Sequence, residues 1–184
     1  MASSGGPGSA DTRDPAFDEP IRLVPHDRHW PAAFAAERDR LLSLFRSQLQ
    51  RIEHIGSTAI PGLPAKPIID LLAGVASMDV ADALFEPILG AGYTTSRPFN
   101  AMLPDRRWFM RASDGRRTHH LHVVVADGKA WQEHLAFRDR LRASPALATE
   151  YADLKRDLAT RFRRDREAYT DAKSAFVTRV LATL

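Results

Sequence analysis

A glycine–serine pair followed by an aspartate in an apolar segment is the pattern in this sequence that could carry chemistry. Gly56 and Ser57 precede a proline-rich stretch, and Asp70 lies inside the apolar run of residues 68–72. A carboxylate in such a run costs several kcal/mol if it stays unpaired, and a divalent metal ion is a natural partner. Glycine lets the backbone approach an anion closely, and a serine hydroxyl can donate to a phosphate oxygen. The pattern therefore predicts a site that handles a nucleotide.

A second group of candidates is the histidine run of residues 119–122. Side chains alternate along a strand, so His120 and His122 share one face. Two imidazoles at that spacing can bind one metal ion or contact one phosphate cluster. The alternative is that one histidine bonds to a neighbour and the other lies at the rim of the sheet. If their strand lies beside the strand of Asp70, we expect these three side chains to converge on one metal site.

Lysines that could neutralise a phosphate group stand at three places. Lys66 lies on the proline-stiffened loop before Asp70, where an ammonium group is a good point charge for phosphate. Lys155 and Lys173 each follow a tyrosine (residues 151 and 169) by four positions, so each pair shares a helical face. These faces could line a nucleotide cleft. The alternative is two core tyrosines with lysines that extend outward to solvent.

Composition narrows the class of protein. The chain has 184 residues, 44% hydrophobic and 27% charged, which is typical of one globular domain. It has no cysteine, so a disulfide framework and thiolate chemistry are excluded. No apolar run is long enough for a membrane span and no secretory signal stands at the start, so we expect a cytoplasmic protein.

Motifs of other enzyme classes are absent from the sequence. It contains no Walker-type Gly-Lys-Ser/Thr run, no Gly-x-Ser-x-Gly elbow and no His-Glu-x-x-His helix. The net charge is +3, and basic residues gather in 97–117 and 155–166. Few aromatic residues stand among them, so nucleic acid is not expected as the main partner.

The pattern of apolar residues predicts an α+β fold. We expect residues 1–20 to form a disordered tail and residues 21–184 a single domain, with a sheet core over 21–128 and a helical part over 129–184. The sheet is expected to be mixed, with about five strands and flanking helices. Expected strands include 21–24, 51–55, 67–75, 93–95, 107–112 and 119–125, and expected helices include 31–50 and 81–89.

Several segments together resemble one known family. Residues 54–70, 118–124 and 134–139, with the tyrosine–lysine pairs at 151–155 and 169–173, are similar to the motifs of the GrpB family. The resemblance implies the nucleotidyltransferase superfamily fold, in which a Gly-Ser turn holds the triphosphate and three carboxylates bind metal ions. Gly56 and Ser57 match the turn and Asp70 the first carboxylate. Leu72 stands at the second carboxylate and His122 at the third.

The expected function is metal-dependent transfer of a nucleoside monophosphate from a nucleoside triphosphate, ATP first among them, to a small-molecule acceptor. The alternative is a catalytically degenerate module that binds a nucleotide or a CoA-like ligand and acts through a protein partner. A homodimer is also left open. The predicted catalytic residues are Asp70, His122 and Lys66. The predicted ligands of Mg²⁺ or Mn²⁺, with Zn²⁺ as an alternative, are Asp70, His122 and His120. The predicted nucleotide-binding residues are Gly56, Ser57, Thr58, Lys66, Lys155, Tyr169 and Lys173.

Overall fold

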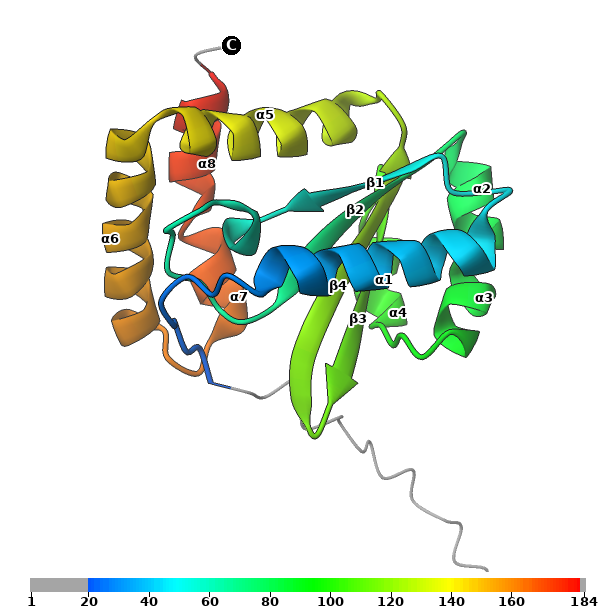
Figure 1. The fold of residues 1–184 in the computed structure, drawn as a ribbon, viewed down its shortest axis with the longest axis horizontal. Helices are drawn as coiled ribbons and strands as arrows, with labels where there is room; N and C mark the ends of the chain where they lie inside the picture. The colour runs from blue at the N-terminus through cyan, green and yellow to red at the C-terminus, as the bar shows by residue number, and fades with distance from the viewer. Residues whose placement is uncertain (1–19, 183–184) are drawn as a thin grey trace, which may run out of the picture.

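A mixed sheet of four strands lies at the centre of the part of the chain that the structure, a computed structural model, describes: residues 20–182 (Figure 1). The strand order is β1-β2-β4-β3; β2 and β4 run parallel, and the two outer pairs are antiparallel. The strands are β1 (Arg51–Ile55), β2 (Ile69–Val75), β3 (Arg106–Ser113) and β4 (Arg116–Val125). The predicted disordered tail lies outside the described residues, except for Pro20.

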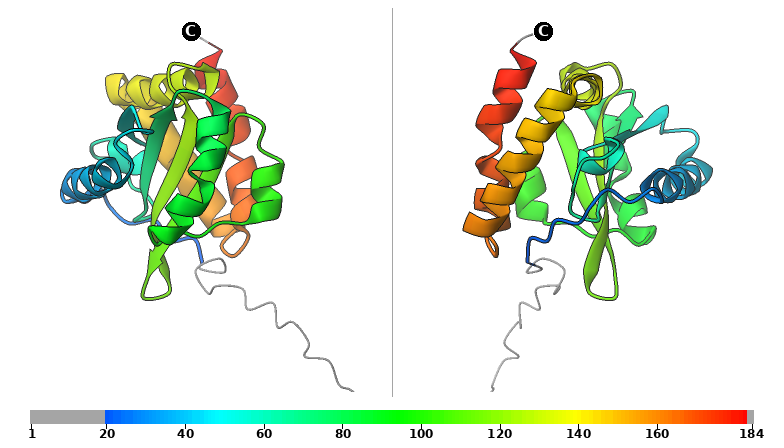
Figure 2. Two further views of the ribbon diagram at one scale, coloured as in Figure 1. Left: turned by 90° about the vertical axis from the view of Figure 1, so that its right-hand side faces the viewer. Right: turned by 60° about the vertical axis from the view of Figure 1, so that its left-hand side comes forward.

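Helices cover both faces of the sheet and extend beyond it. One face is covered by α1 and α2, the other by α5, and α6 and α8 pack against α5 (Figures 1 and 2). The helices are α1 (Trp30–Phe45), the short 3-10 helix η2 (Ser57–Ala59), α2 (Met78–Ala83), α3 (Phe85–Gly90), α4 (Arg97–Ala101), α5 (Lys129–Ala143), α6 (Pro145–Arg161), α7 (Arg166–Asp171) and α8 (Ser174–Leu181). Among the described helices, none has the length and apolarity that a bilayer crossing requires.

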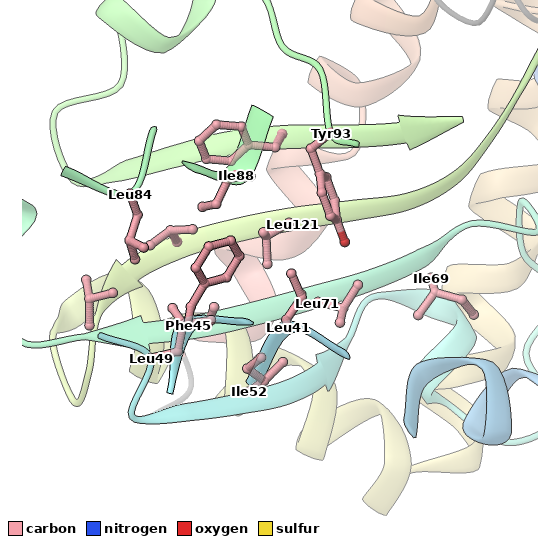
Figure 3. Close-up of a cluster of buried hydrophobic side chains, with 14 of the residues drawn as sticks. Leu41, Phe45, Leu49, Ile52, Ile69, Leu71, Leu84, Ile88, Tyr93 and Leu121 are labelled. Atoms are coloured by element: carbon pink, nitrogen blue, oxygen red, sulfur yellow. The ribbon is translucent and has the colours of Figure 1, made fainter. Parts of the chain in front are cut away.

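The larger core lies between the sheet and helices α1 to α3. Leu71 and Leu121, from the adjacent strands β2 and β4, are fully buried there against Leu41 and Phe45 of α1 (Figure 3). Because side chains alternate along a strand, the residues next to Leu71 in β2 and next to Leu121 in β4 point to the opposite face of the sheet. Asp70 and His120 therefore point away from the larger core.

On the opposite face, α5 packs closely over the middle of the sheet. Leu72, Val124 and Trp131 form a buried cluster there. A side chain at Gly74 would meet the Trp131 ring, because a Cβ atom would lie 3.0 Å from Trp131 Cζ3. Helix α5 therefore covers the sheet around Leu72 and Gly74, whereas Asp70 lies nearer the start of β2.

A third cluster joins the helical part of the chain to the loop between β1 and β2. Ile60 and Leu63 of that loop are buried against Leu141, Tyr151 and Phe176 of helices α5, α6 and α8. The Tyr151 and Phe176 rings stack with their centroids 4.9 Å apart. The helices that follow the sheet in sequence thus fix the position of the loop that carries the Gly-Ser turn.

The α+β class and the mixed sheet are confirmed, whereas the expected fifth strand is not. Residues 21–24 contribute an isolated bridge, Val24 with Ala65, and residues 93–95 another, Thr94 with Met110. Both segments lie beside the sheet elements without extending the ladder. The strands expected over 107–112 and 119–125 correspond to β3 and β4, which pair antiparallel as a hairpin around the Asp114–Gly115 turn.

Two predicted helices differ in extent from the observed ones. The helix expected over 81–89 is two short helices, α2 and α3, which break at Leu84. Pro87 has no N–H to donate to the carbonyl of Ala83, and its ring crowds that carbonyl, so a continuous helix is disfavoured. The helix expected over 31–50 ends at Phe45, because the chain must turn to bury Leu49 before β1 begins.

The larger core predicts a clear difference between two leucine truncations. Leu121→Ala removes a fully buried side chain and should lower the free energy of unfolding by about 2–5 kcal/mol. Leu44→Ala is the control, because Leu44 is 52% exposed, and its effect should stay within about 0.5 kcal/mol. Urea denaturation of the two variants measures both values, and equal losses would contradict this assignment of the core.

Candidate functional site

The parallel pairing of β2 and β4 places Asp70 beside His120. The two residues are register partners, and His120 Nδ1 lies 3.0 Å from Asp70 Oδ1. Their strands are far apart in the sequence, so only the sheet topology brings the two side chains together. The predicted adjacency of the aspartate strand and the histidine strand is confirmed.

The Gly-Ser turn lies directly against the same carboxylate. Ile55, the last residue of β1, pairs with Asp70, and the chain then turns at Gly56 with a φ angle of +69°. A Cβ atom at position 56 would lie 2.2 Å from Asp70 Oδ2, a distance that no side chain tolerates. Glycine is therefore required here both by the backbone angle and by the closeness of the carboxylate. The two halves of the motif at 54–70 form one site.

Lys155 of α6 holds the turn from the helical side. Its Nζ donates to Ser57 Oγ at 3.0 Å and to the carbonyl of Pro64 at 2.5 Å, and the side chain is only 2% exposed. The Tyr151 hydroxyl forms a further hydrogen bond with Ser57. A buried ammonium group thus stands next to the serine that was predicted to bind phosphate.

Two further lysines flank the ring of Tyr169. Lys173 Nζ lies 4.3 Å and Lys66 Nζ 5.2 Å from the ring centroid, within cation–π distance. Tyr169 itself is 1% exposed. Tyr169 therefore belongs to the core, as the alternative interpretation expected. Lys173, however, lies near Lys66 at the tyrosine ring and does not extend to solvent.

The environment of the three lysines favours their neutral forms. Burial, with the neighbouring charges of Lys173 and Arg166, lowers the pKa of Lys66 to about 7. Burial, with the charges of Lys173 and Lys66, lowers the pKa of Lys155 to about 7. Burial lowers the pKa of Lys173 to about 8, and Asp70 opposes the shift for all three lysines. An anionic ligand among the three lysines would raise their pKa values and favour their charged forms, so this cluster is suited to bind an anion.

The hydrogen bond between Asp70 and His120 fixes the protonation of both groups. Burial raises the pKa of Asp70, but the bond from His120 and the charges of His120, His122 and Lys66 outweigh it and hold the pKa below its usual value. Burial lowers the pKa of His120. An ionised carboxylate only accepts, so a neutral His120 donates from Nδ1 and keeps its lone pair on Nε2. That Nε2 atom is buried and has no hydrogen-bond partner.

His122 lies on the same strand face but packs against α5 instead of bonding to Asp70. Its ring centroid is 5.5 Å from that of His134, which donates from Nδ1 to the carbonyl of Ala130 at 2.7 Å. His122 Nδ1 is buried without a hydrogen-bond partner. Burial and the neighbouring His134 lower the pKa of His122 well below its usual value. The geometry thus gives the contact with the carboxylate to His120, not to the expected His122.

The predicted three-residue metal centre is not confirmed. Within residues 20–182, no group of three or more His, Asp or Glu side chains is arranged to hold a metal ion. Asp70 Oδ1 already accepts a bond from His120, which directs the free imidazole nitrogen away from the carboxylate. Asp70 keeps 24% of its side chain exposed. One carboxylate fits Mg²⁺ or Mn²⁺ when substrate phosphates and water supply the other ligands, and it does not fit an all-protein centre.

Thr58 does not direct its side chain toward the anion site, in contrast to the prediction. It is 1% exposed; its hydroxyl donates to the carbonyl of Ile68 at 3.3 Å and lies 3.0 Å from His54 Nε2. The His54 ring in turn stacks on Phe34 of α1 at 4.6 Å. Thr58 and His54 tie the turn to the start of β2, and this is a positioning role.

Two arginines of α5 brace the turn, and the sequence analysis did not foresee this. Arg138 Nη1 donates to Glu53 Oε2 at 2.8 Å and to the carbonyl of His54 at 3.0 Å. Arg142 Nε donates to the carbonyl of Ala59 at 2.9 Å. Arg138 and Glu53 are 85 residues apart, so no local spacing could indicate the contact.

Comparison with known proteins identifies the family of this chain. The family described as "GrpB protein" matches residues 20–183. The chain belongs to the GrpB family. The Glutamate-rich protein GrpB of Alkalihalophilus pseudofirmus is 39% identical over 88% of this chain and 94% of that protein. The crystal structure of GrpB from Enterococcus faecalis superimposes with a TM-score of 0.76 at 34% identity, over 86% of this chain and 94% of the other.

One further relative of this GrpB chain carries an enzyme name. The dephospho-CoA kinase of Mycolicibacterium paratuberculosis is 34% identical over 84% of this chain. The matched region covers only 43% of that protein, so the chain corresponds to less than half of it. The likeness shows that a GrpB-like region also occurs within a longer polypeptide.

Contact between Gly56 and Asp70 predicts that two glycines respond differently to substitution. Gly62→Ala places a side chain at φ +78° with no atom within 4 Å, and should cost about 1–2 kcal/mol for the backbone angle alone. Gly56→Ala adds the collision with Asp70 and should cost about 1–3 kcal/mol more in the free energy of unfolding. Chemical denaturation compares the two. In an Asp70→Ala background the extra cost should become smaller, because the carboxylate is gone and only the Cβ of residue 70, at 3.0 Å, remains close. An extra cost that is unchanged in that background would contradict the contact.

The lysine cluster predicts that anion affinity falls as pH rises. With pKa values lowered to about 7 and 8, these lysines are charged below that range and neutral above it, and only the charged forms attract an anion. Sulfate, whose charge stays constant, should bind more weakly at about pH 9 than at about pH 6, with proton uptake on binding. Calorimetric titration in two buffers of different ionisation enthalpy measures this uptake. The substitution Lys66→Met should reduce the proton uptake, whereas Lys129→Met, at an exposed lysine, should leave it unchanged.

Proposed function

We propose that this member of the GrpB family binds a nucleoside triphosphate, with ATP as the first candidate, and transfers its nucleoside monophosphate to a small-molecule acceptor. The observation that carries the proposal is the contact of Asp70 with Gly56, next to a serine that Lys155 holds. A carboxylate, a glycine turn and buried lysines at one place are the groups that a polyphosphate and its metal ion require. The fold relationship implied by the motifs points to the same chemistry.

Each part of the site has a role in that reaction. The Gly56–Ser57 turn and the lysines Lys66, Lys155 and Lys173 would hold the triphosphate and neutralise its charge. Asp70 would hold Mg²⁺ or Mn²⁺ together with the phosphates, and such a cation would stabilise charge that develops on them. The position of the Asp70 carboxylate is fixed by the hydrogen bond from His120. Positioning and charge neutralisation supply most of the rate in phosphoryl transfer generally.

The chemical step balances without any further reagent. An oxygen or nitrogen of the acceptor forms a bond to the α-phosphorus, while the bond from that phosphorus to the bridging oxygen of the β-phosphate breaks. The electron pair leaves with pyrophosphate, and the acceptor's proton passes to solvent. Metal binding would be coupled to nucleotide binding, because Asp70 alone offers a protein ligand.

A second candidate function follows from Leu72. This residue stands where the second carboxylate would be and is fully buried under α5 with Trp131. A leucine side chain has no atom that can bind a metal ion, so this site would bind a nucleotide or a CoA-like ligand without turnover. A module of this kind would act through a protein partner, and the GrpB-like region within a dephospho-CoA kinase supports that arrangement.

A turnover screen separates the two functions. The purified protein is incubated with each of four α-labelled nucleoside triphosphates, Mg²⁺ or Mn²⁺, and pooled metabolite acceptors. We expect labelled adduct and pyrophosphate from the wild type and from Asp153→Asn, an exposed control on α6. Asp70→Asn should lower the rate by about 100-fold or more, as loss of a group that stabilises transition-state charge does.

Calorimetric titration of the same nucleotides accompanies the screen. Binding that depends on Asp70 and a divalent ion, without adduct from any acceptor pool, would favour the binding module over the enzyme. Absence of binding by all four nucleotides would contradict the enzyme and would leave, of the binding module, only the form that takes a CoA-like ligand.

A further inference from the structure

A groove of about 750 Å³ opens beside Lys66, outside the turn and the carboxylate. Its size is that of a pocket for one small molecule. Four segments form its walls: the start of the described chain, the loop before β2, the β3–β4 hairpin and the first residue of α7. The lining residues are Pro20, Arg22, Lys66, Pro67, Ile68, Ser113, Asp114, Arg116, Arg117, Thr118 and Arg166.

Backbone contacts hold these walls together. The Ile21 N–H donates to the carbonyl of Arg163 at 2.8 Å, which joins the first segment to the loop before α7. Val24 and Ala65 exchange hydrogen bonds of 2.8 and 3.0 Å, which fixes that segment beside Lys66. The views agree that the hairpin end of β3 and β4 lies on this side of the molecule (Figures 1 and 2). The groove is thus built by the fold rather than by a loose loop.

The groove is strongly basic and adjoins the proposed triphosphate site. Among the described residues that line it, arginines stand beside Lys66 at four positions, 22, 116, 117 and 166, against one carboxylate, Asp114. The charges of Arg166 and Arg117 contribute to lowering the pKa of Lys66, so these guanidinium groups act on the same space as the lysine cluster. A cationic ligand would be repelled by this set. A ligand with a phosphate group suits it, because guanidinium groups bind phosphate in a bidentate manner.

We propose that this groove binds the acceptor, and that the acceptor is a small metabolite with a phosphate group distant from its reacting atom. The proposal rests on the proposed function, because Lys66 borders both the groove and the triphosphate site. The arginines hold the phosphate group of the acceptor, and the reacting atom then extends past Lys66 toward the α-phosphate. A nucleic acid fits less well, because none of the described residues that line the groove is aromatic and could stack on bases.

The test uses a matched pair of probes, ribose 5-phosphate and ribose, which differ only in the phosphate group. Calorimetry measures their binding to the full chain with ATP and Mg²⁺ present, and ATP binding is measured separately. Ribose 5-phosphate should bind and ribose should not. The double variant Arg22→Gln with Arg116→Gln, on two exposed side chains, should weaken ribose 5-phosphate by about tenfold or more and ATP by less than about twofold. Arg46→Gln, exposed at the end of α1, is the control.

Each of the following outcomes would overturn the inference. Ribose 5-phosphate and ribose could bind alike or not at all, or the double variant could leave ribose 5-phosphate binding unchanged. If the double variant loses affinity for ATP and for ribose 5-phosphate to the same extent, the groove is part of the nucleotide site. Tighter binding of a single-stranded oligonucleotide, lost in the double variant and steeply salt-dependent, would make it a nucleic-acid surface. If the wild type binds ribose 5-phosphate but does not bind ATP, the proposed function is refuted. The groove would then be a phosphate-binding site without a role in binding an acceptor.

Discussion

An ionised carboxylate in the middle of a sheet is the constraint on which the rest of the site depends. Asp70 lies in a strand whose neighbours are buried, and leaving its charge uncompensated there would cost several kcal/mol. The bond from His120 requires β2 and β4 to lie side by side in parallel, and the room for the carboxylate requires glycine at position 56. Helices α5 and α6 then hold that turn through Arg142 and Lys155. Sheet topology, turn and helical part therefore all serve the placement of one charge.

The buried lysines make the complementary half of this arrangement. Three ammonium groups close together repel one another and lose hydration, and the lowering of their pKa values to about 7 and 8 costs stability. Such strain persists where function needs it. Tyr169 offsets part of the cost, because two of the lysines lie within cation–π distance of its ring. The helical part after residue 128 supplies two of these lysines, which explains why it packs against the turn rather than standing apart.

Sequence reasoning reached the parts of the site that depend on local periodicity. Strand alternation placed His120 and His122 on one face, and helical spacing paired Lys155 and Lys173 with their tyrosines. The convergence of the two histidines with Asp70 depended on the pairing of β2 with β4, which the sequence analysis stated only as a condition. It did not show that His122 packs against α5 or that Thr58 turns inward, because both depend on contacts between segments distant in the sequence. The same limit applies to the bracing arginines. The fifth strand was overestimated because a single bridge and a short strand share one local pattern.

The balance between carboxylates and lysines bears on what the site can do. A nucleotidyltransferase with three carboxylates neutralises the triphosphate mainly through metal ions. In the proposed reaction Leu72 and His122 stand in place of two of these carboxylates, so more of the neutralisation would fall to the lysines around the turn. Fixed charges hold a polyphosphate in place but do not activate an attacking group as a second metal ion can. If catalysis occurs, the acceptor must therefore be held accurately, and a basic groove that opens beside Lys66 provides such a hold.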